Sequence, residues 1–297
     1  VARAEHEQKT FNDIWRTLPT VDEPDEDAEV RQLEVKDIKL PEENLLYFIE
    51  KASPILKPWQ RELVRIARNV SQYFYPQKQT KVMNEGCATF VHHYIMHALY
   101  DKGLISEGAI MEFLHSHSSV VFQPEFDDQR YSGINPYALG FAMMADIKRI
   151  STEPTAEDRE WFPDFAGRGD WRDVLKDAWM NYRDESFILQ YLSPKVIRDF
   201  RLFALHDDAS EGHYEIEAIH DGAGYRRVRE TLARQYDLGM HEPNIQVVSA
   251  DLEGDRMISL RHEAHAGRML DPKTKEDVLW HVHHLWGHKV KMDEEAA

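Results

Sequence analysis

The sequence predicts an α+β protein: a mainly helical domain followed by a C-terminal βαββαβ module of the ferredoxin-like type. From residue 41 to about 205, apolar side chains recur every three or four positions, as they do in amphipathic helices. Beyond Asp207 they alternate instead, over residues 214–220 and 244–261. The length of 297 residues also suggests about two domains. We therefore divide the chain into an acidic arm (1–40), a helical domain (41–205) and the βαββαβ module (206–297).

Composition excludes several classes of protein. The formal net charge of −17 repels phosphate backbones and anionic lipid, so we expect no nucleic-acid binding. No segment reaches the roughly 20 apolar residues of a membrane-spanning helix, so we expect no membrane insertion. A single cysteine, Cys87, and a start without a signal-peptide pattern indicate a cytoplasmic protein. The chain begins at Val1 without an initiator methionine, which suggests a piece of a longer protein.

The first 40 residues are expected to form a largely unstructured, solvated arm. Residues 22–43 hold ten acidic side chains against three basic ones. Pro24 and Pro41 lie within this stretch, and Pro19 lies just before it. Such a segment buries too little apolar surface to offset the entropy lost on ordering.

Helices are expected in order along residues 41–205. Prolines 54 and 58 separate the first from the second, which Pro76 should end. A third should cover residues 81–101, with Gly103 just beyond its end. The fourth starts after Ser106 and gives way to a long polar loop over residues 116–135. The later helices are expected over residues 136–150, 171–180 and 194–205.

In the C-terminal module, we expect strands at residues 214–220, 244–250 and 257–261, with a short last strand near Val290. Gly254 marks the hairpin turn between the second and third strands. One helix, ending before Gly239, follows the first strand, and another begins at Pro272. This order predicts a four-stranded antiparallel sheet with both helices on one face.

Candidate metal ligands gather in the third and fourth helices. Glu85 and His92 lie seven residues apart, on one face of a helix, where a carboxylate and an imidazole can approach one ion or one water molecule. His115 and His117 flank Ser116 where a helix meets the long loop, and alternate residues of an extended segment face the same way. The alternatives are a buried ion pair for Glu85 and hydrogen bonds to backbone carbonyls or a helix-capping role for the histidines.

The long loop is the remaining candidate element of the site. Loops of this length in compact domains are usually functional or disordered, and Phe122, Tyr131 and Ile134 argue against disorder. We therefore expect the segment from Ser132 to Asn135 to close over the Glu85 helix.

Several further stretches carry a resemblance to a known family. At these motifs the sequence resembles the SpoVR family, the stage V sporulation protein R-like proteins. The matching stretches are LKPWQ (56–60), MNEG (83–86), MEFLHSH (111–117), VFQP (121–124), YSGINPYALGF (131–141), DESF (184–187), QYLSP (190–194) and EPNIQV (242–247). Two positions depart from the family, which usually has tryptophan where this chain has Cys87 and Val91.

The resemblance implies a role in bacterial sporulation, in spore cortex formation, or in stress responses, where such proteins are encoded beside a PrkA-type serine kinase. Family members resemble longer proteins with an additional N-terminal half that holds a histidine-rich helix. If the family has a zincin-like centre, that half would supply two of its ligands.

Two functions follow as hypotheses. The first is a metal-dependent hydrolase, with zinc as the first choice of metal, ligands among Glu85, His92, His115 and His117, and Ser132 and Asn135 in the loop over the site. The second is a non-enzymatic scaffold that binds a serine kinase or another regulatory protein. Metal content and kinase co-purification distinguish them.

Overall fold

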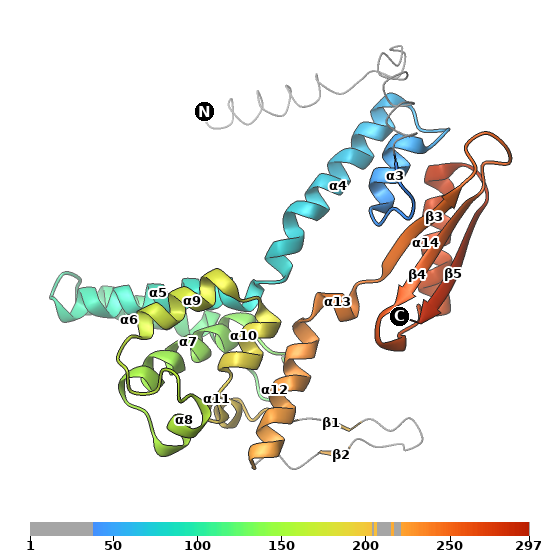
Figure 1. Ribbon diagram of the computed structural model, residues 1–297. Coiled ribbons are helices and arrows are strands. Elements are labelled where there is room, and N and C mark those ends of the chain that lie inside the picture. The colour runs from blue at the N-terminus through green and yellow to red at the C-terminus, as the bar shows by residue number, and fades with distance from the viewer. Residues whose placement is uncertain (1–37, 204, 207–214, 217–220, 297) are drawn as a thin grey trace, which may run out of the picture. The chain divides into compact units, whose positions relative to one another are not determined.

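The structure is a computed structural model that describes residues 38–203, 205–206, 215–216 and 221–296 (Figure 1). The predicted acidic arm, up to residue 37, lies outside these residues. The chain forms two compact units. One, here called the sheet unit, contains residues 38–75 and 239–296; the other, the helical unit, contains residues 76–238. The two units divide after residues 75 and 238, whereas the predicted boundaries lie at residues 40 and 205.

The sheet unit is built on three strands. β3 (Asn244–Ala250) pairs antiparallel with β4 (Ile258–Ala264), and β4 pairs parallel with β5 (Val290–Ala296). The turn between β3 and β4 is held by the Asp251 carboxylate, which accepts hydrogen bonds from the backbone N–H groups of residues 253, 254 and 255. The two predicted strands and the hairpin between them are confirmed.

Two helices complete the core of the sheet unit. α14 (Pro272–Trp286) connects β4 to β5, after the short η1 (His265–Gly267), and α3 (Leu45–Ala52) comes from the other end of the chain. Phe48 of α3 stacks on Trp286 of α14 with ring centroids 5.7 Å apart, and both belong to the cluster that contains Val247 and Leu260. The backbone of residues 42 and 247 forms two hydrogen bonds of 2.9 Å, which tie the start of this segment to β3. Segments distant in sequence therefore share one core.

The helical unit contains most of the remaining elements. They are α5 (Lys81–Asp101), α6 (Glu107–Val120), α7 (Pro136–Thr152), α8 (Ala156–Trp161), α9 (Trp171–Asn181), α10 (Asp184–Tyr191), α11 (Pro194–Asp199), β1 (Leu205–His206), β2 (Glu215–Ile216) and α12 (Gly222–Tyr236). Two further helices, α4 (Pro58–Lys78) and α13 (Leu238–His241), cross the limits between the units.

At the centre of the helical unit, α5 and α7 pack with their backbones in contact. A Cβ atom added to Gly86 of α5 would lie 2.5 Å from the Cα and carbonyl carbon of Gly140 in α7. Only two facing glycines permit this approach, because any larger side chain would meet backbone atoms. Met83, Leu139 and Met143 fill the core beside this crossing. The crossing gives a structural reason for Gly86 in the motif at residues 83–86 and for Gly140 in the motif at residues 131–141.

A buried carboxylate begins α5. Asp184, the first residue of α10, is fully buried and accepts hydrogen bonds from the backbone N–H groups of Val82 (2.8 Å) and Met83 (2.9 Å). These amides belong to the first turn of α5, where no intrahelical acceptor exists. Asp184 therefore joins the start of α5 to α10 and gives the motif at residues 184–187 a structural role.

The predicted α+β class is confirmed, but the ferredoxin-like βαββαβ arrangement is not. Glu215 and Ile216 of the expected first strand pair with Leu205 and His206 in a separate antiparallel ladder, not with the three-stranded sheet. The expected first helix of the module, α12, packs on α10, and its Tyr225, Val228 and Leu232 belong to the core of the helical unit. The last strand also pairs parallel to its neighbour, whereas an all-antiparallel sheet was expected.

Helix limits agree with the sequence in part. The predicted helix over residues 81–101 is confirmed at both ends. The expectation that Pro76 ends the second helix is wrong, since α4 continues to Lys78. The last expected helix of the predicted helical domain is shorter than predicted, because α11 ends at Asp199. Within the described residues, no helix is both long enough and apolar enough to cross a membrane.

Candidate functional site

Imidazoles from two helices meet in the helical unit. α5 contributes His93 and His97, one turn apart, and their rings stack with centroids 3.9 Å apart. α6 contributes His117, whose ring centroid lies 5.0 Å from that of His93. We call these three side chains the histidine cluster. Phe113 of α6 and Phe141 of α7 pack against the cluster at 4.8–6.2 Å, so aromatic carbon surrounds much of it.

Hydrogen bonds fix part of the cluster. Nδ1 of His97 lies 2.9 Å from the backbone carbonyl oxygen of His93, so this nitrogen donates in the bonded tautomer and Nε2 keeps its lone pair. Nε2 of His117 is buried and has no hydrogen-bond partner among the described residues. An imidazole nitrogen in this situation is costly to bury unless something binds it.

The surroundings of the cluster favour neutral imidazoles. Burial, with the neighbouring His97, His117 and Lys148, lowers the pKa of His93 from 6.5 to about 4. Burial and the nearby His92 and His97 also lower the pKa of His117. Both rings are therefore uncharged at neutral pH, and a neutral ring nitrogen is the form that binds a metal ion or accepts a proton.

Glu85 begins the same face of α5 two turns before His92. Its carboxylate is partly buried and accepts a hydrogen bond from the Tyr137 hydroxyl of α7, and this bond raises the pKa of Tyr137. Tyr137 directly follows Pro136 at the start of α7, so the loop that ends at Asn135 places a polar partner beside Glu85.

The four predicted ligands occupy different surroundings. His92 is exposed and lies edge-on to Phe113 at 4.8 Å, whereas His117 joins the histidine cluster. His115 is exposed. The expectation that His115 and His117 lie on an extended segment is wrong, because α6 continues to Val120. Two residues apart on a helix, their side chains point away from each other.

The predicted loop residues also differ from each other. Ser132 is exposed, whereas Asn135 joins three segments. The Asn135 side chain accepts from the backbone N–H of Tyr137 (3.0 Å) and donates to the carbonyl oxygens of Val120 (2.9 Å) and Phe122 (3.1 Å). Asn135 is thus the N-cap of α7 and holds the C-terminal end of α6 beside it.

The described part of the chain does not provide a complete set of metal ligands. Across the described residues, no group of three or more His, Cys, Asp and Glu side chains is placed to hold a metal ion. The predicted set of Glu85, His92, His115 and His117 therefore does not fit a complete metal site. Two members of the histidine cluster, His93 and His97, were not predicted. Their spacing of four residues on the helix that carries His92 was the signal that could have identified them.

Comparison with known sequences now gives the class of protein. The family "SpoVR like protein" matches residues 1–241, and "SpoVR-like C-terminal domain" matches residues 243–297. The chain belongs to the SpoVR family. It is 53% identical over 294 residues to the Escherichia coli (strain K12) protein described as "Uncharacterized protein YcgB". That alignment covers 99% of this chain and 56% of the relative, so the chain spans little more than half of the relative's length. No solved structure matches the chain.

The neutral state of His93 predicts a pH dependence of stability. In the unfolded chain the ring protonates near its ordinary pKa of 6.5, whereas in the folded chain it does so only near 4. As the pH falls from 6.5 to 4, the unfolded state binds the proton first, so the free energy of unfolding should decrease over this window. Denaturant unfolding followed by circular dichroism at several pH values measures this dependence.

His93→Gln should make that dependence shallower. His115→Gln is the matched control, because it removes one exposed imidazole from the same unit. If His93→Gln and the unmodified chain lose stability in parallel on acidification, His93 does not cause the pH dependence.

Proposed function

We propose that this SpoVR-family chain carries part of a divalent-metal site, with zinc as the first choice, in a cytoplasmic metal-dependent hydrolase of sporulation or stress response. The observation that carries the proposal is the histidine cluster. The rings of His97 and His117 lie 3.9 Å and 5.0 Å from that of His93. Burial favours the neutral form of His93 and His117, and His117 Nε2 lacks a partner among the described residues.

The number of ligands supports a shared site. A catalytic zinc usually has three protein ligands and one water molecule. The described residues do not gather such a set, and this chain aligns with only 56% of its relative. In a protein of the relative's full length, residues outside the aligned region would supply the remaining ligands. The 297-residue chain is then expected to bind zinc weakly and to have no hydrolase activity.

Zinc titration calorimetry tests this proposal. The unmodified chain should bind zinc weakly, and His117→Gln should weaken binding further, because it removes the buried nitrogen that has no partner in the part of the chain that the structure describes. His115→Gln is the matched control on the same helix and should leave binding unchanged. Tight binding by the chain alone would contradict a shared site, and equal binding by the two variants would exclude His117 as a ligand.

Glu85 requires a separate test in a longer SpoVR protein. If the Tyr137-bonded carboxylate is also a ligand, Glu85→Ala should weaken zinc binding there by about tenfold or more. Equal affinity of the variant and the unmodified protein would leave Glu85 with the hydrogen bond to Tyr137 as its role.

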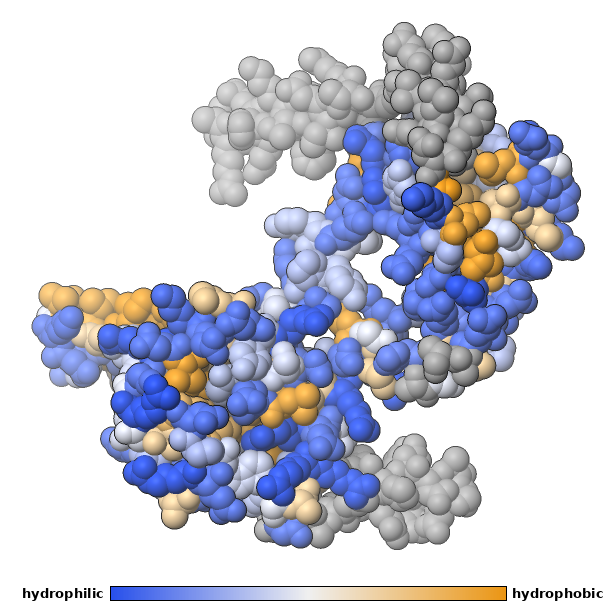
Figure 2. Space-filling view, in the orientation of Figure 1, coloured by the Kyte–Doolittle hydropathy of each residue, from blue (hydrophilic) through white to orange (hydrophobic). Residues whose placement is uncertain are grey.

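An exposed apolar surface supports a second candidate, a scaffold for a serine kinase or another regulatory protein. The end of the α5–α6 hairpin exposes Ile95, Leu104 and Met111, at 46%, 67% and 66% of their surface. Figure 2 shows apolar side chains gathered along this part of the helical unit. Elemental analysis of a purified SpoVR protein of the relative's full length separates the candidates, because stoichiometric metal supports the first. Metal-free protein that retains a kinase supports the second.

A further inference from the structure

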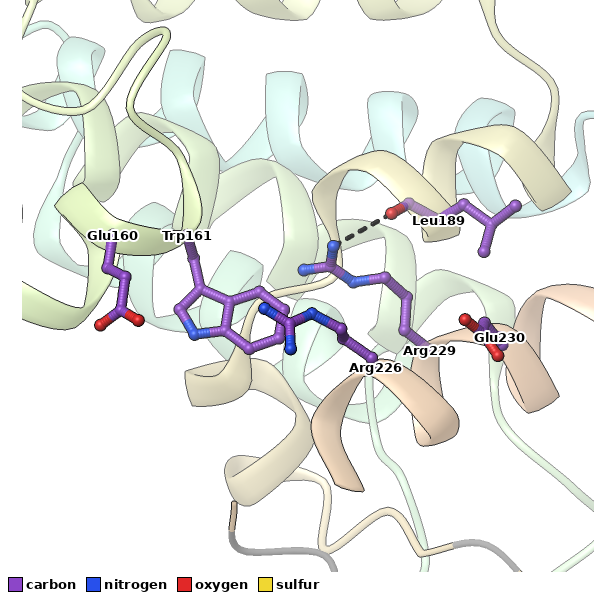
Figure 3. Close-up of a pocket in the computed structure, with 6 residues that line it drawn as sticks. All are labelled: Glu160, Trp161, Leu189, Arg226, Arg229 and Glu230. Carbon is purple, nitrogen blue, oxygen red and sulfur yellow. Dashed lines mark hydrogen bonds between the residues drawn. The ribbon is translucent and has the colours of Figure 1, made fainter. Parts of the chain in front are cut away.

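A pocket of about 310 Å³ lies in the helical unit, and none of its lining residues belongs to the histidine cluster (Figure 3). It lies between α8, α10 and α12. Its lining residues are Glu160, Trp161, Leu189, Arg226, Arg229 and Glu230.

Two arginines of α12 lie over one tryptophan of α8. The guanidinium carbons of Arg226 and Arg229 lie 5.2 Å and 4.8 Å from the centre of the Trp161 ring. Figure 3 shows both guanidinium groups directed toward the indole. Three residues apart on a helix, the two arginines share a face, so α12 itself sets their spacing.

Arg229 is held firmly by the end of α10. Its Nε donates to the carbonyl oxygen of Leu192 at 2.9 Å, its Nη2 donates to the same oxygen, and its Nη1 donates to the carbonyl oxygen of Leu189 at 3.1 Å. A guanidinium has five N–H groups, so these three bonds leave two N–H groups for a ligand. Arg226 is exposed at the mouth of the pocket.

Neither arginine has an acidic partner within the described part of the chain. The neighbouring Arg198 shows the usual arrangement, since it donates two hydrogen bonds to Glu157. Among the described residues, no such ion pair forms at Arg226 or Arg229, although the chain carries a net charge of −17. Burial and the charge of Arg226 lower the pKa of Arg229 to about 10, as expected for a desolvated cation without a counter-ion.

We propose that this pocket binds the phosphate group of a phosphate monoester between Arg226 and Arg229, above Trp161. Paired guanidinium groups match the several oxygens of a phosphate and form charge-assisted hydrogen bonds with it. The group could come from a small metabolite or from a phosphorylated side chain. Glu160 and Glu230 line the same pocket, so they repel the anion and limit its affinity.

Calorimetry on the whole 297-residue chain at constant ionic strength tests the proposal, with three probes: inorganic phosphate, O-phosphoserine and a peptide that contains one phosphoserine. Arg226→Gln should weaken binding by about tenfold or more, since it removes charge-assisted hydrogen bonds. Arg227→Gln is the matched control, because it changes the charge equally at the next residue, outside the pocket lining. Glu230→Gln should strengthen binding.

The results separate the proposal from a general charge effect. Tighter binding of the phosphopeptide than of inorganic phosphate and O-phosphoserine identifies a phosphorylated side chain as the source, whereas equal binding identifies a small phosphate monoester. Equal losses in Arg226→Gln and Arg227→Gln, or no binding of any probe by the unmodified chain, would overturn the proposal. Circular dichroism of each variant confirms that it is folded.

Discussion

Gly140→Ala is expected to lower the free energy of unfolding by about 3 kcal/mol or more. The added methyl group would meet the carbonyl oxygen of Val82 and would lie 2.6 Å from the Cα of Gly86. Both atoms belong to the α5 backbone, so no side-chain rotation relieves the contact. The helices must separate, and the core around Met143 loses its packing.

Gly108→Ala is the matched control for that variant. Gly108 also lies inside a helix, α6, but a methyl group there would meet only the Ser106 hydroxyl oxygen at 3.9 Å. Alanine is the better helix former, so this change should leave stability unchanged or raise it by about 0.5–1 kcal/mol. Denaturant unfolding of the three proteins measures the difference. Similar stability of Gly140→Ala and Gly108→Ala would show that the α5–α7 crossing is wider than described.

Asp184→Ala is expected to cost about 2–4 kcal/mol of folding free energy. The change leaves the N–H groups of Val82 and Met83 without an acceptor at a fully buried position. It also removes a negative charge from the N-terminus of α5, where the helix dipole favours one. Asp184→Asn keeps one acceptor oxygen and should have an intermediate effect.

Ser106→Ala controls for the loss of an ordinary helix cap in the same unit. The Ser106 hydroxyl accepts from the backbone N–H of Ala109 at the exposed start of α6, so water can replace it. We expect a loss of about 1 kcal/mol, measured by the same unfolding experiment. An equal loss for Asp184→Ala would contradict the special importance of the buried cap.

Local patterns predicted the elements with strong periodicity or clear end signals. The helix over residues 81–101 and the hairpin around Gly254 follow from such patterns. The arrangement of elements did not follow, because tertiary contacts decide it. The apolar face of α12 could pack on a sheet as well as in the core of the helical unit. In the structure its Val228 and Leu232 are buried in that core. Pro76 was a misleading signal, since it lies in the last turn of α4, where little of the helix remains to be disrupted.

The candidate site was predictable only in its location. The sequence pointed to α5 and α6, which do carry the histidine cluster. The choice of residues depended on where α6 ends: with an end before Ser116, His115 and His117 would face the same way, but with the end at Val120 only His117 turns inward. The pocket beside Trp161 joins α8 to α12, which are distant along the chain, and no local pattern indicates that Arg226 and Arg229 lack acidic partners among the described residues.

The sheet unit combines two segments that lie far apart in the sequence, and this has a consequence for synthesis on the ribosome. Phe48 of α3 packs on Trp286 of α14, and the backbone of residue 42 bonds to that of residue 247 in β3. About 190 residues separate α3 from β3 along the chain. At roughly 5–20 residues per second, the ribosome reaches β3 about 10–40 s after α3. During that interval the helical unit, whose sequence is continuous, can fold first. A shorter chain that begins at residue 243, where the C-terminal family match starts, would leave the apolar surface around Trp286 without Phe48 and prone to aggregation.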